Sequence, residues 1–486
     1  MALGDRTGMC GLIGIVGTPD SAYESFLGLM NLQHRGQDGA GILTVDPYCG
    51  QFSLQKGSGL VENVFSERSF RNLRGLCAIG HTRYATIGRR DPNMLQPFLE
   101  AEAGIGIAHN GNIVNCYQLR EDLIDRTPAI RFSTESDSEI ILKILAEALG
   151  DGPRDVSTVF LAITRAMEVL VGSYSVVGAL KDGSVFGFRD PDGIRPLVFG
   201  RKSMNGKAAY ALASESVALD YLGYAGIDEI QPGEAILIDS NGQVTRKVLH
   251  QKTHSSCMFE WVYFARVESE FEREPVYRAR FRLGTVLADS IKQRKIEADV
   301  VLPVPETSRI AAIAIAESLD LPFRELLIKN RYVNRTFILD GQESRQEAIR
   351  RKLFPIAAEI EGKRCLVVDD SIVRGNTAIQ ILKLIKQCGA REVTVVSTCP
   401  PICHPCYYGI DFPSPKELVA YNRTEDEIAR VLGADRIVYQ TVEGLKKALE
   451  QDSICAGCLT GQYPTDVSSG ADFELKRLAD RQKQLS

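Results

Sequence analysis

The strongest constraint on the fold is a change of secondary-structure rhythm near the middle of the 486 residues. Before about residue 250, short strand-like stretches follow one another with few helical patterns, which favours antiparallel sheets covered by helices. From about Arg280, apolar strands such as 299–304 and 365–369 alternate with helical patterns such as 376–387. Buried strands separated by helices of this length indicate βαβ units around a parallel sheet. The sequence therefore predicts an α+β first half of sandwiched sheets and an α/β second half.

The remaining expected elements and boundaries follow from the same patterns. The first half is predicted to hold strands at 11–16, 40–45, 174–180, 184–188 and 234–238 and helices at 136–149 and 156–170, and the second half adds a helix at 308–318 and a strand at 393–397. A polar stretch at 250–256 marks the boundary between the halves. We expect a leader at 1–9, a first domain at 10–250, a second domain at 251–464 and a charged, loosely held tail at 465–486.

The composition narrows the class of protein. A net charge of -5 argues against a general binder of nucleic acid, which would show a basic balance. No run approaches the ~18 consecutive apolar residues of a membrane helix, and the first nine residues lack the apolar core of a signal peptide. Twelve cysteines without an export signal are expected to be thiols in the cytoplasm, where clustered cysteines indicate metal binding or catalysis. Five of them show no grouping: Cys49, Cys77, Cys116, Cys365 and Cys388.

Cys10 lies directly before an apolar strand pattern. A cysteine that begins a mature chain can use its own α-amine as the base, because the pKa of that amine, about 7.7–8.0, lies close to about 8.5 for the thiol. The preceding nine residues would then have to be absent, since an acylated nitrogen is no longer a base. A propeptide at 1–9 and a translation start at Met9 with loss of that methionine are both open, and we favour the propeptide. Taken alone, a buried thiol explains such a cysteine more often.

Four further motifs follow Cys10 in order and change this expectation. They are QHRGQDGAG at 33–41, HTRYAT at 81–86, AHNGN at 108–112 and STESDSE at 133–139. Together with the Cys10 segment, they resemble the glutaminase domain of class II (N-terminal nucleophile) amidotransferases. The resemblance gives none of His34, His81 and His109 the part of a base, so we expect these histidines to be structural.

The resemblance to class II glutaminases implies a role for five residues. Cys10 would attack the side-chain amide of glutamine, while the Asn110 amide and the Gly111 backbone N–H would form the oxyanion hole. Such donors stabilise the charge that develops in the tetrahedral intermediate. Arg83 would bind the α-carboxylate, for which a guanidinium fork is suited, and Asp137 would pair with the α-ammonium.

A second group of motifs begins at the run VVDDSIVRGNT, residues 367–377, which ends a predicted strand and opens a predicted helix. Backbone N–H groups at a helix start bind phosphate well, whereas Asp369 and Asp370 should face hydroxyl groups or a metal ion. The run resembles the signature of type I phosphoribosyltransferases. That resemblance implies that the two acids face the ribose hydroxyls and the magnesium of phosphoribosyl pyrophosphate. The other residues expected to bind this substrate are Ser371, Gly375, Asn376 and Thr377.

Two more segments support the resemblance to type I transferases. The run PVPETS at 303–308 resembles the loop that meets the pyrophosphate, which implies that Thr307 helps to hold magnesium. The run KNRYVNRTF at 329–337 resembles the loop that closes over the substrate, which implicates Lys329 and Arg331 in binding phosphoribosyl pyrophosphate.

A glutaminase followed by this transferase resembles the glutamine phosphoribosylpyrophosphate amidotransferase family, from residue 10 to about residue 464. The resemblance implies the first committed step of purine (IMP) synthesis: glutamine, phosphoribosyl pyrophosphate and water give 5-phosphoribosylamine, glutamate and pyrophosphate, with internal transfer of ammonia. It also implies Mg²⁺ as a cofactor, feedback inhibition by purine nucleotides and a homodimer or homotetramer. Two alternatives stay open. The phosphate cradle argues against another class II amidotransferase, and the complete glutaminase motifs argue against a non-catalytic phosphoribosyl pyrophosphate-binding regulator.

The remaining cysteines include two CxxC pairs, Cys403 with Cys406 and Cys455 with Cys458. From spacing alone, these pairs predict a four-cysteine zinc site. Some members of the resembled family instead carry a [4Fe-4S] cluster, and the match implies Cys257, Cys406, Cys455 and Cys458 as its ligands. We favour the iron–sulfur cluster, with Cys403 as a bystander and with a structural role, because the cluster lies outside both expected active sites.

Overall fold

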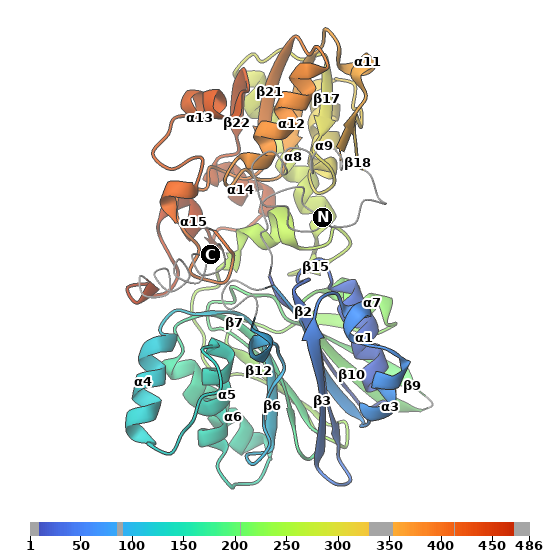
Figure 1. The fold of residues 1–486 in the computed structure, drawn as a ribbon, viewed down its shortest axis with the longest axis vertical. Coiled ribbons are helices and arrows are strands. Elements are labelled where there is room, and N and C mark those ends of the chain that lie inside the picture. The colour runs from blue at the N-terminus through green and yellow to red at the C-terminus, as the bar shows by residue number, and fades with distance from the viewer. Residues whose placement is uncertain (1–8, 85–90, 205, 330–352, 413, 471–486) are drawn as a thin grey trace.

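The computed structural model of the chain describes residues 9–84, 91–204, 206–329, 353–412 and 414–470. Its two lobes lie one above the other along the long axis, the N-terminal half forming one lobe and the C-terminal half the other (Figure 1). Within these ranges, no helix is long and apolar enough to cross a membrane.

The N-terminal lobe is built on two stacked antiparallel sheets. Their facing sides share a buried core to which Leu12 and Leu212 contribute from the first sheet and Val177 and Ile236 from the second. The first sheet has the strand order β11 (Ala225–Glu229), β9 (Val198–Met204), β10 (Lys207–Ala213), β1 (Gly11–Val16), β4 (Cys77–Arg83), β2 (Gly39–Asp46) and β3 (Gln51–Ser58). The second has the order β13 (Val244–Val248), β12 (Glu234–Ile238), β8 (Val185–Arg189), β7 (Gly172–Leu180), β6 (Ile105–Ile113) and β5 (Phe98–Glu100).

Helices cover the outer face of each sheet, which makes four layers. The first sheet is covered by α1 (Ser21–Asn31), α2 (Val61–Val64), α3 (Glu67–Asn72) and α7 (Ser216–Tyr221), and the second by α4 (Cys116–Arg126), α5 (Asp137–Leu149) and α6 (Val156–Val169). The expected sandwich of antiparallel sheets is confirmed, as are the helices predicted at 136–149 and 156–170. The lobe contains more helices than the sequence predicted, because the apolar patterns of α1 and α4 are too weak to be recognised.

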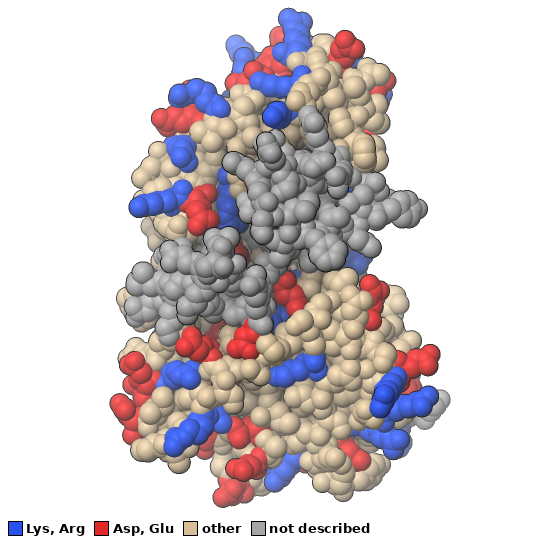
Figure 2. Space-filling model, in the orientation of Figure 1, with Lys and Arg blue, Asp and Glu red and all other residues tan. Residues whose placement is uncertain are grey.

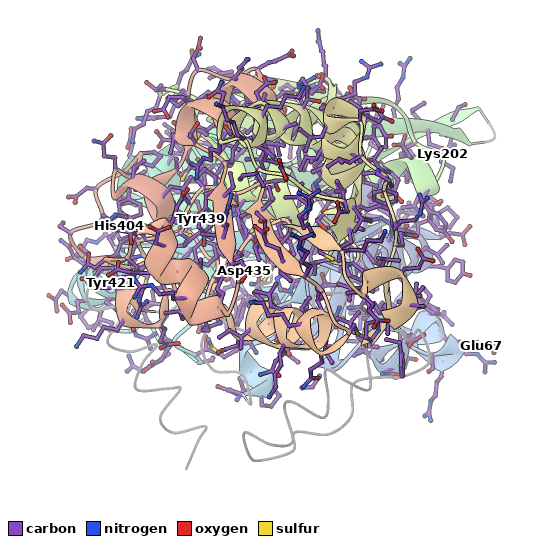
Figure 3. All side chains as sticks on the ribbon, turned by 90° about the horizontal axis from the view of Figure 1, so that it is seen from above. Glu67, Lys202, His404, Tyr421, Asp435 and Tyr439 are labelled. Carbon is purple, nitrogen blue, oxygen red and sulfur yellow. The ribbon has the colours of Figure 1, made fainter. Side chains whose placement is uncertain are left out.

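The C-terminal lobe contains the expected parallel sheet, with the order β17 (Val300–Pro303), β20 (Arg364–Asp369), β21 (Glu392–Ser397) and β22 (Arg436–Tyr439). Helices α8 (Val276–Gln293) and α9 (Arg309–Leu319) pack on one face, while α12 (Asn376–Gln387) and α13 (Glu425–Leu432) pack on the other. Both faces of the strands are therefore buried, which explains their nearly continuous apolar sequences. Figure 3 views this lobe from above, with Asp435 directly before β22 and Tyr439 as its last residue.

Short elements complete both lobes, one in the N-terminal lobe between β4 and β5 and the rest in the C-terminal lobe. They are η1 (Pro92–Met94), β14 (Ser256–Cys257), the π-helix η2 (Glu260–Phe264), β15 (Glu270–Phe271), β16 (Glu274–Pro275), β18 (Leu327–Lys329), β19 (Leu353–Pro355), α11 (Ala357–Ile360), η3 (Pro415–Glu417), α14 (Val442–Leu449), β23 (Ile454–Cys455) and α15 (Gly457–Thr460). Of the expected tail, residues 471–486 lie outside the described ranges, whereas Thr465 hydrogen-bonds the Tyr408 hydroxyl at 2.8 Å. The described start of the tail is thus anchored.

The two lobes share a buried core and a buried ion network. Trp261 and Phe259 of the second lobe pack in one apolar cluster with Ile194 of the first. The fully buried Arg35 guanidinium contacts Glu215 at 2.5 Å and, across the junction, Glu260 at 2.7 Å. Such a network ties the lobes together, because removing one member would leave a buried charge unpaired. On the face shown in Figure 2, Lys and Arg are interspersed with Asp and Glu over both lobes.

Candidate active sites and cysteine centre

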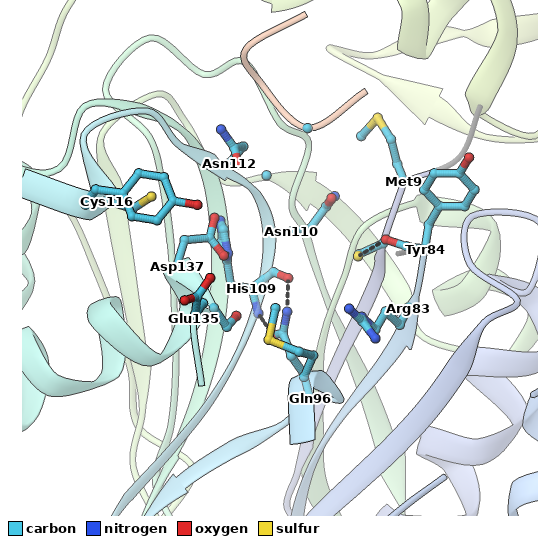
Figure 4. Close-up of a pocket in the computed structure, with 16 residues that line it drawn as sticks. Met9, Arg83, Tyr84, Gln96, His109, Asn110, Asn112, Cys116, Glu135 and Asp137 are labelled. Atoms are coloured by element: carbon cyan, nitrogen blue, oxygen red, sulfur yellow. Dashed lines mark hydrogen bonds and ion pairs between the residues drawn. The ribbon is translucent and has the colours of Figure 1, made fainter. Parts of the chain in front are cut away.

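One pocket of the N-terminal lobe brings together all five residues that the glutaminase motifs single out (Figure 4). Cys10 lies directly before β1, Arg83 ends β4, Asn110 and Gly111 belong to β6, and Asp137 begins α5. The first sheet therefore supplies the thiol and the guanidinium, while the second sheet and its covering helix supply the amide, the glycine and the carboxylate. Segments more than a hundred residues apart meet at one end of the sandwich.

Asn110 presents a hydrogen-bond donor to this pocket. Its side chain is 2% exposed, and its Nδ2 has no hydrogen-bond partner within the described part of the chain. Buried donors are nearly always paired, and leaving one unpaired costs about 1–3 kcal/mol. An orphaned amide beside a cysteine is the arrangement that an oxyanion hole requires. The neighbouring Gly111 has a φ of +143°, and a Cβ there would lie 2.0 Å from the Ser173 carbonyl oxygen, so only glycine fits.

The Cys10 thiol points into the pocket, with Sγ 3.9 Å from the Tyr84 carbonyl oxygen. Burial raises the pKa of this thiol, whereas the contact with Tyr84 and the charge of Arg83 lower it. Arg35 Nε donates a hydrogen bond of 3.0 Å to the Cys10 carbonyl oxygen and so fixes the backbone of the nucleophile. Met9 precedes it as a buried residue of the same pocket.

Arg83 and Asp137 lie on opposite sides of the pocket (Figure 4). Burial lowers the pKa of the Arg83 guanidinium, although Cys10 and nearby carboxylates oppose that shift. Asp137 accepts a hydrogen bond of 3.1 Å from the backbone N–H of Ile113, which orients its carboxylate. A cation and an anion on opposite walls match the α-carboxylate and α-ammonium of a free amino acid.

Two of the three histidines contact neighbouring side chains and the third is fully buried, and His109 also lines the pocket. His34 Nε2 lies 2.7 Å from Glu215 Oε1, and His109 Nδ1 lies 3.1 Å from the Ser138 hydroxyl. His81 is fully buried, and burial lowers its pKa to about 3, so its ring is neutral at physiological pH.

Gln96 and Gly409 are among the residues of this pocket that the sequence analysis missed. Gln96 holds the backbone of His109 from both sides, accepting from its N–H at 2.7 Å and donating to its carbonyl oxygen at 3.2 Å (Figure 4). Gly409 belongs to the C-terminal lobe and yet lines the glutaminase pocket. Neither residue lies in a recognisable motif, so only the folded chain reveals them.

The second predicted site lies at the carboxyl ends of the parallel strands, where Asp369 ends β20. Asp370 accepts a hydrogen bond of 2.8 Å from the Ser371 hydroxyl and another from the Thr307 side chain. Burial, together with the charge of the neighbouring acid, raises the pKa of Asp369, and burial raises that of Asp370, while Arg280 opposes the shift at Asp370. A buried acid beside a partly exposed one, both with raised pKa values, favours a cation or hydroxyl groups as ligands.

A cradle for phosphate follows these acids at the start of α12. Gly375 has a φ of +80°, a left-handed conformation that suits glycine, and places Asn376 as the first helical residue. The Thr377 hydroxyl is buried without a hydrogen-bond partner among the described residues, as expected of a group that awaits an anion. Lys329, at the end of β18, lies 4.0 Å from Glu306 of the predicted pyrophosphate loop. Arg331 lies outside the described ranges.

The acids and Thr307 fit a magnesium ion, although the described ranges hold no group of three or more His, Cys, Asp or Glu side chains arranged around a metal ion. Mg²⁺ usually binds through one or two carboxylates together with substrate phosphates, so a protein cage is unnecessary. The adjacent Asp369 and Asp370, with Thr307 at hydrogen-bonding distance from Asp370, form such a partial site.

One buried cluster holds five cysteines (Cys257, Cys399, Cys406, Cys455 and Cys458), while the Cys403 side chain packs in another. Cys257 and Cys455 face each other as register partners of the parallel pair β14–β23. Burial raises the pKa of the Cys458 thiol, and the neighbouring Cys406 and Cys455 raise it further. Cys403 instead packs with the core of the parallel sheet, its Sγ 3.7 Å from the Ala420 carbonyl oxygen. All twelve cysteines are free thiols, as expected.

The gathered thiols are of the type that holds a zinc ion or an iron–sulfur cluster. The described ranges hold no group of three or more His, Cys, Asp or Glu side chains arranged around a metal ion. The Cys406 sulfur also accepts a hydrogen bond of 3.4 Å from the Tyr408 N–H, and Arg195 supplies a nearby positive charge, both of which suit thiolate ligands.

Two protein-family models match the chain in the order of its lobes. The glutamine amidotransferase domain matches residues 81–221, and the phosphoribosyl transferase domain matches residues 277–408. The amidophosphoribosyltransferase of Escherichia coli is 42% identical over 453 residues, which cover 92% of this chain and 89% of that protein. The amidophosphoribosyltransferase of Saccharomyces cerevisiae is 41% identical over 485 residues, covering 96% and 95%.

Solved structures agree with these sequence relatives. The glutamine phosphoribosylpyrophosphate amidotransferase of B. subtilis, complexed with ADP and GMP, superposes with a TM-score of 0.84 and 36% identity, covering 94% of this chain and 98% of that one. A structure described as the allosteric regulatory enzyme of purine biosynthesis gives a TM-score of 0.86 and 36% identity, covering 96% and 99%. With both lobes matched in order and nearly full length covered, the chain belongs to the amidophosphoribosyltransferase family, the glutamine-dependent transferases of purine biosynthesis.

Proposed function

We propose that this chain converts glutamine, phosphoribosyl pyrophosphate and water into 5-phosphoribosylamine, glutamate and pyrophosphate through the two sites described above. The observation that carries the proposal is their presence in one chain: a pocket with Cys10 beside an orphaned amide, and a cradle with two adjacent acids before a helix start. The shared core between the lobes supports internal transfer of ammonia, which would otherwise be protonated in water.

In the first half-reaction, the Cys10 sulfur attacks the amide carbon of glutamine, and the amide nitrogen leaves as ammonia once it has gained a proton. A thioester remains, and water hydrolyses it to glutamate. Asn110 Nδ2 and the Gly111 N–H donate to the oxygen that becomes negative. Losing one such donor typically costs ~10²–10³ in rate. The α-amine of Cys10 takes the thiol proton, as in other N-terminal nucleophiles.

Arg83 and Asp137 position the substrate for that attack. A guanidinium fork binds the α-carboxylate, and the carboxylate on the opposite wall binds the α-ammonium. The two contacts select a free amino acid over a peptide-bound glutamine, because they require both charged groups.

In the second half-reaction, ammonia forms a bond to the anomeric carbon of the ribose, and pyrophosphate leaves with the electrons of the broken bond. Asp369 and Asp370 hold the ribose hydroxyls, and Lys329 and Arg331 bind the pyrophosphate. The N–H groups at the start of α12 hold the 5-phosphate. The residues that assist them there are Ser371, Gly375, Asn376 and Thr377.

We propose two resident cofactors. Mg²⁺, held by Asp369, Asp370 and Thr307, would neutralise charge on the leaving pyrophosphate. A [4Fe-4S] cluster bound by four cysteines (Cys257, Cys406, Cys455 and Cys458) would cross-link β14, the loop after β21, β23 and α15. A zinc ion on the paired CxxC motifs is the alternative, and metal analysis distinguishes the two.

We further propose feedback regulation by purine nucleotides, assembly into a homodimer or homotetramer, and a cytoplasmic location. The nucleotide proposal is supported by the B. subtilis neighbour, a complex with ADP and GMP.

The experiment that tests the proposed function measures ammonia and phosphoribosylamine formed from glutamine, with and without phosphoribosyl pyrophosphate. We expect both products when both substrates are present. Another class II amidotransferase would release ammonia without forming phosphoribosylamine, and a non-catalytic regulator would bind phosphoribosyl pyrophosphate without either product. Either result would refute the proposal.

The proposed base adds a requirement at the start of the chain. Met9 is 2% exposed, its N–H donates to the Arg35 carbonyl oxygen at 2.9 Å, and its Sδ lies 2.7 Å from Arg195 Nη1. With Met9 attached, the nitrogen of Cys10 is an amide. We expect the active enzyme to begin at Cys10, and intact-mass measurement tests it. Glutamine-dependent activity from chains that still carry Met9 would refute the α-amine mechanism.

A further inference from the structure

We infer that residues 407–409 of the C-terminal lobe are a working part of the glutaminase site: they hold the strand that carries the oxyanion hole, and Gly409 sets the position of Gly111. The inference rests on the proposed function of the pocket and extends it to a segment nearly 300 residues further along the chain. The glutaminase site is then complete only when the transferase lobe is docked against it.

Three buried side chains of the N-terminal lobe bind the backbone of the 407–409 segment. Asn112 Nδ2 donates to the Tyr407 carbonyl oxygen at 2.8 Å. The Ser173 hydroxyl and Arg195 Nε donate to the Tyr408 carbonyl oxygen at 3.0 and 3.1 Å. Asn112 lies on β6 two residues after Asn110, and Ser173 is its register partner on β7. The segment is therefore attached to the two strands that shape the oxyanion hole.

Gly409 makes the closest approach to the oxyanion hole. Its φ is +98°, and a Cβ at this position would lie 2.8 Å from the Gly111 carbonyl oxygen, 3.1 Å from its carbonyl carbon and 3.5 Å from its Cα. Gly111 also lies close to β7, since its own Cβ would be 2.0 Å from the Ser173 carbonyl oxygen. Ser173 and Gly409 therefore both limit the room at Gly111.

The second lobe fixes the 407–409 segment as firmly as the first. Tyr408 is 1% exposed, and its hydroxyl lies 2.8 Å from the Thr465 hydroxyl. Its N–H donates to Cys406 Sγ at 3.4 Å. A segment held on both sides places its neighbours precisely enough for catalysis, since a displacement of about 1 Å can lower a rate by about 10²-fold. Its own side chains take no part in the chemistry, so Gly409 is a positioning residue.

The test compares Gly409→Ala with Gly433→Ala in the full chain. Both glycines have left-handed φ values, +98° and +77°, but a Cβ at Gly433 would meet nothing within 4 Å. Alanine would take a left-handed φ in both variants, and only Gly409→Ala would also press a Cβ on Gly111. We expect Gly409→Ala to lower the glutamine-dependent kcat by about 10²-fold, with the KM for glutamine and the ammonia-dependent rate within about twofold of wild type. Gly433→Ala should leave both rates within about twofold.

A second variant and a chemical probe separate this role from a loss of folding. Asn112→Ala removes the 2.8 Å bond to Tyr407 without adding bulk, and we expect a smaller fall in glutamine-dependent kcat, again with ammonia-dependent synthesis preserved. Alkylation of Cys10 by iodoacetamide, followed by peptide mass spectrometry, needs no oxyanion hole and should proceed at the wild-type rate in Gly409→Ala.

Three results would overturn the inference. They are an unchanged glutamine-dependent kcat in both Gly409→Ala and Asn112→Ala, an equal loss of glutamine- and ammonia-dependent synthesis, and an equal effect of Gly433→Ala. Absence of both activities from the wild-type enzyme would instead refute the proposed function itself, so the two failures are distinct.

Discussion

Asn110→Ala removes a hydrogen-bond donor that has no partner in the resting enzyme, so the substitution should affect activity much more than stability. Asn110 Nδ2 is buried without a partner in the described ranges. Because an unpaired buried donor costs about 1–3 kcal/mol, its removal offsets the small loss of packing. We expect little change in the thermal midpoint. The glutamine-dependent kcat should nevertheless fall ~10²–10³-fold, which corresponds to about 2.7–4 kcal/mol of lost transition-state stabilisation.

The matched control lies two residues further along the same strand. Asn112 Nδ2 donates to the Tyr407 carbonyl oxygen at 2.8 Å, so Asn112→Ala breaks a made bond and should cost about 0.5–1.5 kcal/mol of stability. The two substitutions delete the same atoms from the same type of side chain. They should rank in opposite order: Asn112→Ala lowers the thermal midpoint more, and Asn110→Ala lowers the glutaminase rate more.

The assays are glutamate formation at saturating glutamine, ammonia-dependent synthesis and thermal unfolding. Ammonia-dependent synthesis should survive in both variants, because neither residue lies in the transferase site. If Asn110→Ala unfolds at a lower temperature than Asn112→Ala and keeps its glutaminase rate within tenfold of wild type, Asn110 is a structural residue and the reasoning fails.

Four other predictions follow from the two sites, the cysteine centre and the buried histidine. Cys10→Ala should abolish glutamine-dependent synthesis and preserve ammonia-dependent synthesis, and an equal loss of both in a folded variant would refute the two-site assignment. Asp370→Ala should abolish synthesis from either nitrogen source while basal glutaminase persists; wild-type synthesis would refute the cradle. Anaerobically purified protein should be brown, with about four iron and four sulfide per chain. Cys257→Ser should lose iron and stability, whereas Cys403→Ser should keep both. One zinc ion in a colourless protein would contradict the cluster. The pKa of buried His81 is about 3, whereas that of a histidine in the unfolded chain is about 6.5, so the unfolded state takes up a proton first as the pH falls. Protonation of His81 in the unfolded state should therefore lower the free energy of unfolding by about 2 kcal/mol between pH 7 and 5. His81→Gln should flatten this pH dependence, and an unchanged slope would exclude His81 as its source.

Local sequence patterns predicted most of the architecture, because periodicity records which faces of an element are buried. The helix expected at 376–387 and the strand expected at 234–238 match α12 and β12 in their bounds. Helix α1 was missed, because its buried face includes Ser21, Ser25 and Gly28, which leave no apolar stripe in the sequence. Helix α4 buries only three side chains and reads as polar for the same reason.

The sequence by itself pointed to the residues of both sites, because they lie in short runs that resemble known motifs, and the run at 367–377 also joins a strand end to a helix start. Asp369, Asp370 and Thr377 needed no distant partner to be recognised. Tertiary structure alone decided which distant segments complete those sites. The spacing of the CxxC pairs favoured zinc, yet the pairing of β14 with β23 brings Cys257 beside Cys455, and Cys403 turns into another core. Gly409 reaches the oxyanion hole only because the lobes dock. Contacts between segments hundreds of residues apart arise from the packing of whole surfaces, and no local periodicity encodes them.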